Sequence, residues 1–334
     1  MAETVLVTGG SGFVAGWCIV ELLQRGFNVH TTVRALSKEA TVREAISSVT
    51  EFAENLAFFE ADLTYDAGWD EAVEGCDYVL HVASPLENAS AKDADSLIIP
   101  ARDGTLRVLR AASRAGVRRV VVTSSTAACS PPMKSSGVFA DEATWTDLSD
   151  RDLNAYRKSK VIAEKAAWDF IWQNTGPMTL TTVLPPAIFG PVLMKEKLSS
   201  VQLIKQLLIG KPPGILNIGF CIVDVRDLAD FHVRAMLAPE AAGQRFIAAG
   251  KFMWMEEIAK ELRDRLGEQG KKVPTRQLPD LAVHLFTPFI PALKMITSML
   301  GRKQEFSSAK AQRVLHFSPR PANVTIVDCA RSLL

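Results

Sequence analysis

The beginning of the chain constrains its fold most, because a glycine-rich turn there separates a short apolar run from a helical pattern. Residues 5–7 read Val-Leu-Val, the composition of a strand that is buried on both faces. The glycines fall within residues 8–12, and an apolar helical pattern runs from Phe13 to Leu23. Gly26 follows where that helix should end, since glycine takes the left-handed conformation of a helix C-terminus without penalty.

A strand, a glycine turn and a helix in this order predict a phosphate-binding site. Backbone N–H groups at a helix N-terminus point outward, and the helix dipole there favours negative charge. A tight turn that binds nothing is the alternative explanation. The turn lies where a first βαβ unit would begin, and a second strand over residues 27–33 follows one helix length later. Both observations favour the phosphate site.

The end of the second strand indicates which dinucleotide would bind. In dinucleotide-binding folds, the residue ~20 positions beyond the turn lies beside the adenosine ribose. An acidic residue there accepts hydrogen bonds from the ribose hydroxyls of NAD, whereas an arginine suits the 2′-phosphate of NADP. The strand ends in Thr32-Val33-Arg34. This predicts NADP, with a solvated arginine at a strand end as the alternative.

Strands and helices alternate over the first half of the chain, which predicts an α/β fold of the Rossmann type. In that fold a doubly wound parallel sheet has helices on both faces. The further strands are expected at residues 56–60, 77–83, 119–123 and 245–249, and the helices at 37–49, 70–74, 95–115 and 153–174. Ligands of such sheets bind at the carboxyl ends of the strands, so residues at those ends are candidates for a site.

Three strand ends have suggestive chemistry. Asp62 follows the third strand and can accept a hydrogen bond from an adenine amino group, although a helix cap explains it equally well. The small residues 82–85 follow the fourth strand and would let a cofactor lie against the backbone. Residues 123–126, Thr-Ser-Ser-Thr, follow the fifth. By itself this hydroxyl cluster fits capping or turn chemistry better than catalysis.

A tyrosine and a lysine near the start of the next helix favour catalysis. Tyr156 and Lys160 are four residues apart, so they share a helix face and their polar ends can converge. A nearby cation favours phenolate and should lower the pKa of the tyrosine from ~10. Tyrosine tuned in this way is a good proton donor. An exposed surface pair is the alternative for this pair alone.

Composition excludes several other functions. The chain has 334 residues with 38 basic and 37 acidic side chains, so we expect neither nucleic acid nor a membrane surface as a partner. Five dispersed cysteines and the absence of a basic leader at residues 1–3 predict a cytoplasmic protein without a metal site. The apolar stretch 281–300 contains two prolines and a lysine, which favours broken helices over a membrane span.

Together these residues resemble the extended short-chain dehydrogenase/reductase family, and most closely its branch of dihydroflavonol 4-reductase-like ketone and aldehyde reductases. The motifs follow the family order over roughly the first 230 residues: Thr8-Gly9-Gly10-Ser11-Gly12-Phe13-Val14, Thr32-Val33-Arg34, Ala61-Asp62-Leu63, His81-Val82-Ala83-Ser84-Pro85, Thr123-Ser124-Ser125, Tyr156-Arg157-Lys158-Ser159-Lys160, Pro185-Pro186-Ala187-Ile188-Phe189-Gly190-Pro191 and Val223-Asp224-Val225-Arg226-Asp227-Leu228. Each motif is weak alone, and the ordered set is specific.

The resemblance implies a catalytic set of Ser125, Tyr156 and Lys160, with the second serine of the Thr-Ser-Ser triplet chosen from the family pattern. It also implies that the segment from Pro185 to Gly190 passes the nicotinamide. The candidates for binding NADP(H) are Gly9, Ser11, Gly12, Phe13, Val14, Arg34, Lys38, Asp62, Leu63, Val82, Ala83, Ser84, Thr123, Tyr156, Lys160, Pro185, Ala187 and Ile188.

Two positions depart from the family pattern. Ala15 replaces the third glycine of the turn, with Gly16 next to it. The methyl group is small, so cofactor binding should survive. Ser130 stands where plant flavonoid reductases have an asparagine that recognises a catechol. A dihydroflavonol substrate is therefore not expected.

The predicted function is NADPH-dependent hydride transfer to a small ketone or aldehyde, reversible in the direction of alcohol oxidation. We expect a dinucleotide domain of residues 1–185 plus 222–250 and a substrate domain of 186–221 plus 251–334, in a monomer or homodimer. Phe189, Leu216, Phe220 and the segment 285–290 are candidates for an apolar lining, with core packing as the alternative. A nucleotide-sugar epimerase or dehydratase with bound NAD, and a non-catalytic NADP sensor, are the alternative functions.

Overall fold

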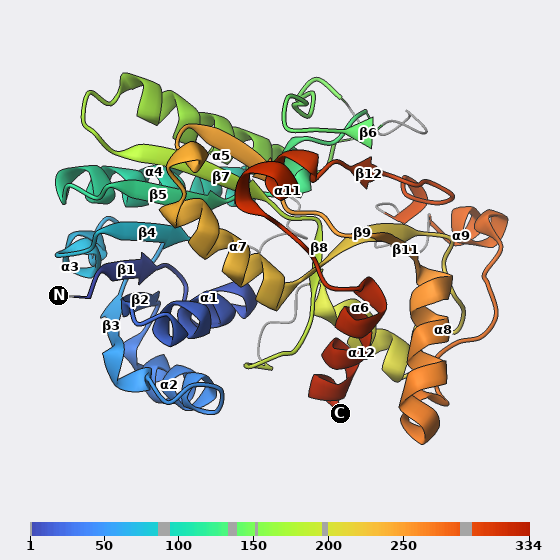
Figure 1. Cartoon of the computed structure of the whole chain (residues 1–334). Coiled ribbons are helices and arrows are strands. Elements are labelled where there is room, and N and C mark those ends of the chain that lie inside the picture. The colour runs from blue at the N-terminus through green and yellow to red at the C-terminus, as the bar shows by residue number, and fades with distance from the viewer. Residues whose placement is uncertain (1, 86–93, 133–138, 151–152, 196–199, 288–295) are drawn as a thin grey trace.

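The structure, a computed structural model, describes residues 2–85, 94–132, 139–150, 153–195, 200–287 and 296–334. Its centre is a seven-stranded parallel sheet in the order β3-β2-β1-β4-β5-β7-β10. The strands are β1 (Thr4–Val7), β2 (Asn28–Val33), β3 (Leu56–Glu60), β4 (Tyr78–His81), β5 (Arg119–Thr123), β7 (Thr179–Leu184) and β10 (Gln244–Ile247) (Figure 1).

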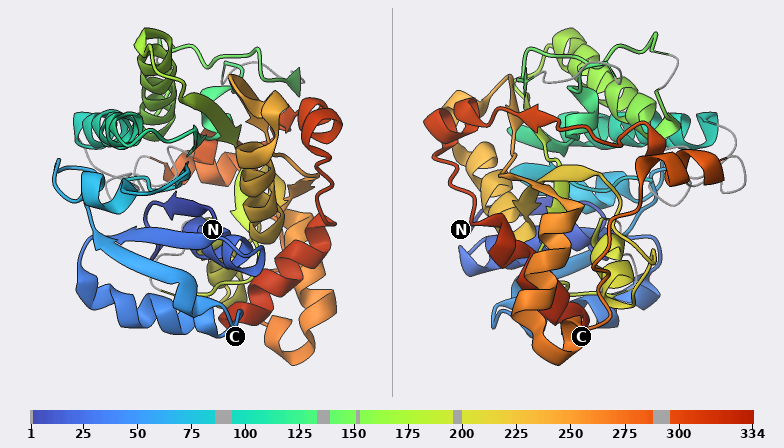
Figure 2. Two further views of the ribbon diagram at one scale, coloured as in Figure 1. Left: turned by 60° about the vertical axis from the view of Figure 1, so that its left-hand side comes forward. Right: turned by 90° about the vertical axis from the view of Figure 1, so that its right-hand side faces the viewer.

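Helices cover both faces of this sheet because its strands alternate their buried side chains. Leu6 and Val120 pack on the side of α3, α4 and α5, whereas Val5 and Val121 pack on the side of α1, α2, α7 and α11. These helices are α1 (Phe13–Gln24), α2 (Glu39–Ser47), α3 (Trp69–Val73), α4 (Asp95–Arg114), α5 (Ala155–Gln173), α7 (Val225–Leu237) and α11 (Ala309–Leu315). Figure 2 shows the two helical layers from the side.

A smaller group of elements packs around a second core at the C-terminal side of the molecule (Figure 1). Its three-stranded sheet has the order β11-β9-β8, and β6 pairs with β12 in a two-stranded sheet. The elements are β6 (Phe139–Ala140), β8 (Ala187–Phe189), β9 (Gly219–Asp224), β11 (Phe252–Trp254), β12 (Glu305–Phe306), α6 (Val201–Leu208), α8 (Met255–Leu266), α9 (Asp280–Phe286) and α12 (Ala322–Leu333). Short 3₁₀ turns cover Leu36–Lys38 (η1), Ala53–Asn55 (η2), Thr126–Ala128 (η4), Pro239–Ala241 (η5) and Gly267–Gly270 (η6).

A buried ion-pair network joins this group to the helices of the large sheet. Asp224 ends β9 with a fully buried carboxylate, which accepts two hydrogen bonds from Arg226 at 2.9 and 2.8 Å. Arg226 also donates to Asp328 of α12 at 2.8 Å. The charged partners raise the pKa of Arg226, which therefore remains a cation.

The structure confirms the predicted parallel α/β fold and most of the predicted elements. The strands at 56–60 and 119–123 have the predicted bounds, and Gly26 follows α1 with a φ of +81°. The fourth strand is shorter than predicted and ends at His81. The backbone leaves the sheet there because the N–H groups of Val82 and Ala83 donate to the Thr8 hydroxyl instead of to a neighbouring strand.

The predicted broken helices over residues 281–300 are only partly within the described chain. α9 ends at Phe286, and residues 288–295 lie outside the described residues. Over the part of the chain that the structure describes, no helix combines the length and apolar character needed to span a membrane.

Candidate active site

The glycine turn after β1 has a conformation that requires glycine. Gly9 has a φ of +76°, and a Cβ there would lie 3.0 Å from Cβ of Ala83. Its N–H donates to Thr32 Oγ1 at 2.9 Å. A Cβ on Gly12 would lie 3.0 Å from the carbonyl oxygen of Gly9. Side chains are thus excluded where a ligand would meet the backbone.

Helix α1 begins directly after this turn. Gly12 is its N-cap, and in the described chain no side chain caps the first turn. Phe13 packs its ring into the C-terminal core, and Val14 packs into the core of the large sheet. Both side chains therefore point away from the open helix end, where backbone N–H groups can meet a phosphate. Together with the close approach at Gly9, this geometry fits the diphosphate of a dinucleotide.

The substitution of Ala15 in the glycine motif is accommodated in the core. Ala15 is only 1% exposed and packs with the residues around α1. The next residue, Gly16, makes the closer approach, because a Cβ there would lie 3.1 Å from Cε of Met194. The close contact at Gly16 is with a side chain of the segment after β8.

The end of β2 presents two cations at the surface. Arg34 follows the strand directly, and Lys38 ends η1; both side chains are exposed. Arg43, nine residues beyond Arg34, donates to the carbonyls of Ala53 and Leu56 at 2.7 and 2.9 Å. That guanidinium fixes α2 against the start of β3.

The loops after β3 and β4 are shaped by internal hydrogen bonds. Asp62 accepts from the N–H and hydroxyl of Thr64 at 2.8 and 2.6 Å, so one of its oxygens stabilises the turn. Leu63 is half-buried and lies against Gly104, where an added Cβ would be 2.7 Å from Cβ of Leu63. Ser84 is partly buried in the loop after β4.

Thr8 ties the loop after β4 to the glycine turn. Its hydroxyl accepts from the N–H groups of Val82 and Ala83, both at 3.0 Å, and lies 2.9 Å from Nδ1 of His81. Since the hydroxyl already accepts twice, it donates its hydrogen to His81, which is neutral at that nitrogen. Burial, followed by the charge of Lys160, lowers the pKa of His81 to about 3. The two loops are therefore held together by a neutral network.

The two serines after β5 have different partners, and only one faces Tyr156. Ser124 Oγ donates to Glu164 at 2.5 Å in the core. Ser125 is the N-cap of η4, and its hydroxyl lies beside the Tyr156 phenol, whose pKa it acts to lower. Ser125 Oγ also lies 3.5 Å from the carbonyl oxygen of Pro185, beside the start of β8. This placement agrees with the choice of Ser125 over Ser124.

Tyr156 and Lys160 lie in the first two turns of α5, which Asn154 caps by accepting from the Arg157 N–H at 2.9 Å. Lys160 Nζ lies 3.4 Å from the Thr123 carbonyl oxygen. Burial lowers the pKa of Lys160 to about 8, and the Glu164 carboxylate opposes that shift. The Lys160 ammonium therefore loses its proton close to neutral pH.

The predicted lowering of the Tyr156 pKa by Lys160 is wrong for this structure. Burial raises the pKa of Tyr156, and the hydrogen bond from Ser125 and the charge of Arg157 oppose the rise only in part. The cation that acts on the phenol is its sequence neighbour Arg157, not Lys160. Tyr156 is therefore a neutral O–H donor, the protonation state that a proton-donating acid requires.

Thr123 contacts Lys160 through its backbone carbonyl, whereas its side chain contacts His232. Its hydroxyl lies 2.8 Å from Nε2 of His232 on α7, and His232 Nδ1 lies 2.7 Å from the Leu228 carbonyl oxygen. A carbonyl accepts only, so Nδ1 bears the proton and the Thr123 hydroxyl donates to Nε2. The carbonyl of Thr123 faces Lys160.

The candidate substrate residues are mostly core residues. Phe189 is 1% exposed, Leu216 is 7% exposed, and both belong to the C-terminal core, against which Phe220 packs. Ala187 and Ile188 are half-buried in β8. Of the segment 285–290, only residues 285–287 are described, and Leu285 is exposed.

Ser130, the position that matches the catechol-recognising asparagine, uses its polar groups in hydrogen bonds within the protein. It is 2% exposed, and its hydroxyl donates to the Thr126 carbonyl at 2.7 Å. Its N–H donates to Thr146 Oγ1 at 2.8 Å. The hydroxyl is thus used to fold the loop after η4.

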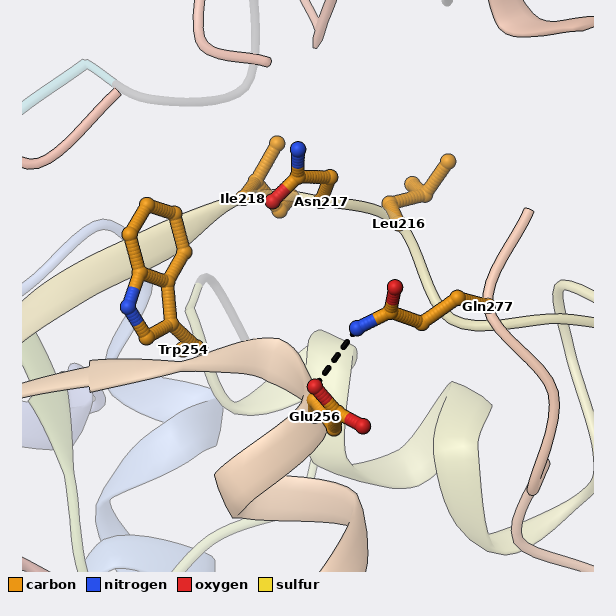
Figure 3. Close-up of a pocket in the computed structure, with 6 residues that line it drawn as sticks. All are labelled: Leu216, Asn217, Ile218, Trp254, Glu256 and Gln277. Carbon is orange, nitrogen blue, oxygen red and sulfur yellow. Dashed lines mark hydrogen bonds between the residues drawn. The ribbon is translucent and has the colours of Figure 1, made fainter. Parts of the chain in front are cut away.

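A separate hollow of about 140 Å³ lies in the C-terminal group of elements (Figure 3). Its lining residues are Leu216, Asn217, Ile218, Trp254, Glu256 and Gln277. The Gln277 side chain donates to Glu256 at 2.5 Å across it. None of the predicted catalytic or cofactor residues lines this hollow, so it is not the site that the motifs define.

Comparison with known proteins supports the identity of the motifs. The profile of the NAD dependent epimerase/dehydratase family matches residues 5–249. The chain belongs to this family. It corresponds to the extended short-chain dehydrogenases/reductases, in agreement with the ordered motifs from the glycine turn to the segment after β9.

Relatives within the family are named as reductases. The "Ketoreductase azaE" of Aspergillus niger is 30% identical and aligns over 100% of this chain and 98% of its own. A dihydroflavonol 4-reductase of Solanum lycopersicum is 33% identical over 79% of this chain and 70% of its own. The crystal structure of Gre2 from Candida albicans in complex with NADPH is 27% identical, with a TM-score of 0.83, and covers 99% of this chain and 98% of its own.

Sequence reasoning missed the polar residues behind the cluster, above all Glu164 on α5. The available signal was spacing, since Tyr156, Lys160 and Glu164 recur every four residues on one helix face. His81 is part of the motif at residues 81–85, but the sequence did not indicate its contact with Thr8. For His232 and for Arg245 of β10, the sequence pattern offered no signal, because their partners are distant in the chain.

Proposed function

We propose that this family member is an NADPH-dependent reductase that transfers hydride to a ketone or aldehyde carbonyl, reversibly, with Ser125, Tyr156 and Lys160 as its catalytic set. The observation that supports this most is the placement of the Ser125 hydroxyl beside the neutral Tyr156 phenol, with Lys160 one helical turn away from Tyr156. The names of the full-length relatives, a ketoreductase among them, agree with it.

The chain's residues supply the proton and the positioning in this mechanism. NADPH, when bound, supplies the hydride that reaches the carbonyl carbon. The Tyr156 hydroxyl donates a hydrogen bond to the carbonyl oxygen and gives up its proton as negative charge develops there. Ser125 donates a second hydrogen bond to the same oxygen. The Lys160 ammonium would hold the nicotinamide ribose, and the charge of Arg157 favours the phenolate that Tyr156 leaves behind.

Arg34 supports NADPH over NADH. Its exposed guanidinium follows β2, and the strand contains no acidic residue to accept hydrogen bonds from ribose hydroxyls. Lys38 lies close by in the sequence and adds positive charge. The NADPH bound to the structural relative Gre2 points in the same direction. An epimerase with tightly bound NAD would favour an acidic residue at position 34.

We propose that the two parts of the chain, each with its own hydrophobic core, bind different ligands. Residues 1–185 plus 222–250 would bind the dinucleotide, and 186–221 plus 251–334 would bind the substrate. The proposed partner is a small carbonyl compound, with no nucleic acid or membrane, and the proposed state is a monomer or homodimer. All five cysteines are buried free thiols, which supports a reducing compartment such as the cytoplasm.

A screen of ketones and aldehydes tests this function. Purified protein is mixed with each compound and NADPH, and cofactor oxidation is followed by absorbance, with NADH in parallel. We expect net oxidation of NADPH with at least one class of carbonyl compound and slower oxidation of NADH. Absence of turnover with every compound, or faster turnover with NADH, would contradict the proposal.

A further inference from the structure

Glu164 is a buried carboxylate on α5 for which the mechanism above has no role. It is 1% exposed and lies one helical turn beyond Lys160 and two turns beyond Tyr156. Residues four apart share a helix face. The three side chains therefore follow one line along the helix, with the carboxylate at the buried end.

Groups from three different strands and from the helix itself converge on this carboxylate. Ser124 at the end of β5 donates to Oε2 at 2.5 Å, and Thr182 of β7 donates to Oε1 at 2.8 Å. Trp168, one turn further along α5, donates its indole N–H at 3.4 Å. Arg245 of β10 donates to Oε1 at 2.7 Å. A buried carboxylate with this many donors is held in one geometry.

Arg245, the charged partner, is itself fixed. Its guanidinium donates to the carbonyls of Glu142 and Thr144 at 2.6 and 3.1 Å and lies 3.6 Å from the ring centroid of Trp145. The arginine thus compensates the negative charge of the carboxylate. Removing one partner of such a buried pair leaves an uncompensated charge.

The Glu164 network reaches the catalytic set by two routes. Ser124 precedes Ser125, so the bond from Ser124 to Glu164 fixes the end of the strand that places the Ser125 hydroxyl against Tyr156. On the helix, Glu164 is the anion that opposes the loss of charge from Lys160.

The other groups around Lys160 provide no negative charge. His81 at the end of β4 is neutral, with a pKa of about 3, and Tyr156 on α5 is held neutral by burial. The Thr123 carbonyl of β5 is an uncharged acceptor, and behind it lies His232 of α7, whose pKa burial lowers to about 4. Among the described residues, Glu164 is thus the anion that acts on Lys160.

We propose that Glu164 is a positioning residue for the catalytic set: its carboxylate fixes the end of β5 through Ser124 and supplies the negative charge that keeps the Lys160 ammonium in place one helical turn away. The kinetic part of this inference rests on the proposed reductase function. The structural part, the coupling of Glu164 to Lys160, does not.

The direct test is a titration of Lys160 that does not depend on activity. Lysines are labelled by reductive methylation with ¹³C, and the Lys160 resonance is assigned by its absence in Lys160→Arg. In Glu164→Gln, which keeps the side-chain size and removes the charge, we expect the pKa of Lys160 to fall by about one unit. The matched control is Thr182→Val, which removes one hydrogen bond to Glu164 and leaves its charge. An unchanged pKa in Glu164→Gln, or an equal fall in both variants, would overturn the proposal.

Kinetics provide the second measurement. The alkaline limb of the pH profile of kcat/KM should move to lower pH in Glu164→Gln by the same amount as the lysine titration, and should stay in place in Thr182→Val. A purely structural role would lower the rate at all pH values without moving the limb, and would contradict the proposal. If the wild type reduces no carbonyl compound, the reductase function fails while the lysine titration still decides the inference.

A second variant covers the case in which Glu164→Gln does not fold because Arg245 is left uncompensated. The double variant Glu164→Gln with Arg245→Gln removes both charges of the buried pair. The double variant still lacks the carboxylate that opposes the loss of charge from Lys160, so the Lys160 pKa should still fall, although by less than in Glu164→Gln because the Arg245 cation is also gone. An unchanged pKa there would overturn the proposal.

Discussion

The two ends of the proposed cofactor site are built in different ways. At the adenosine and phosphate end, the glycine turn offers backbone N–H groups, and Arg34 and Lys38 are exposed cations at the end of β2. At the reaction end, Ser125 is buried, and Tyr156 and Lys160 are half-buried and joined to core residues through hydrogen bonds. The adenosine and phosphate end would thus bind through backbone N–H groups and surface cations, whereas the reaction end would act through desolvated side chains.

This difference predicts different consequences of mutation. An exposed cation contributes to affinity for one ligand group and is screened by salt. A desolvated acid or cation has a shifted pKa, so its removal changes the chemistry and its pH dependence. Substitutions at the first end should therefore alter cofactor preference, and those at the second should alter turnover.

The largest effect is expected at the reaction end, from Tyr156→Phe. The variant lacks the proton donor but keeps the ring, so kcat should fall by about 10²- to 10⁴-fold. NADPH binding, measured by fluorescence titration, should remain within a fewfold of wild type, since the cofactor contacts proposed for the other end are intact. Normal turnover would exclude Tyr156 as the acid.

At the adenosine end, Arg34→Ala should weaken NADPH by roughly ten- to a hundredfold, because charge-assisted hydrogen bonds contribute ~1.5–3 kcal/mol each. NADH lacks the 2′-phosphate and should be affected far less. Arg43→Ala is the control: its guanidinium holds α2 against β3, so that variant should lose thermal stability and keep the NADPH-to-NADH preference. A wild type that prefers NADH, or an equal loss of affinity for both cofactors in Arg34→Ala, would show that Arg34 does not recognise the 2′-phosphate. Calorimetry at fixed ionic strength measures the affinities of wild type and both variants for NADPH and NADH.

The pH dependence should report the reaction end alone. Burial lowers the pKa of Lys160 to about 8, so its ammonium is complete below that pH and is lost above it. We expect kcat/KM to fall by about tenfold per pH unit above pH 8. Stopped-flow rates between pH 6 and 10 check this, with circular dichroism as the control for unfolding. A rate that stays constant to pH 10 would show that Lys160 does not need its charge.

The smallest effect concerns substrate choice. Ser130 uses its hydroxyl within the loop after η4, so no amide stands there to recognise a catechol. The loss of one net hydrogen bond corresponds to roughly two- to tenfold in kcat/KM. Dihydroflavonols should therefore be poorer substrates than simpler ketones or aldehydes by at least this factor. Steady-state kinetics with dihydroflavonols and with simpler ketones and aldehydes measure this ratio. A kcat/KM that is highest for a catechol-bearing dihydroflavonol would contradict the prediction.

The sequence was most informative where local composition determines structure. The apolar runs at residues 56–60 and 119–123 form strands with the predicted bounds, and Gly26 follows the end of α1 as predicted, because buried strands and helix ends depend on nearby residues. The spacing of Tyr156 and Lys160 likewise predicts a shared helix face. The short strands β8, β9 and β11 were not predicted as a second sheet, since three to six residues give little periodicity.

What the sequence could not provide were contacts between distant segments. The direction of the Tyr156 pKa shift depends on burial and on Arg157, and the role of Arg43 depends on carbonyls of the segment before β3. The partner of Ser124 is 40 residues away, and Arg245 reaches Glu164 across 81 residues. These contacts distinguish the two serines, which look alike in the sequence.

Isotope transfer tests the central claim, that this chain moves hydride from NADPH to a carbonyl carbon, most directly. NADPH deuterated at the transferable C4 position is incubated with the protein and a carbonyl compound from the screen, and the alcohol is analysed by mass spectrometry. The account predicts one deuterium on the carbinol carbon and one NADPH oxidised per alcohol formed. Product without deuterium, or interconversion of stereoisomers with no net oxidation of the cofactor, would contradict it and favour an epimerase.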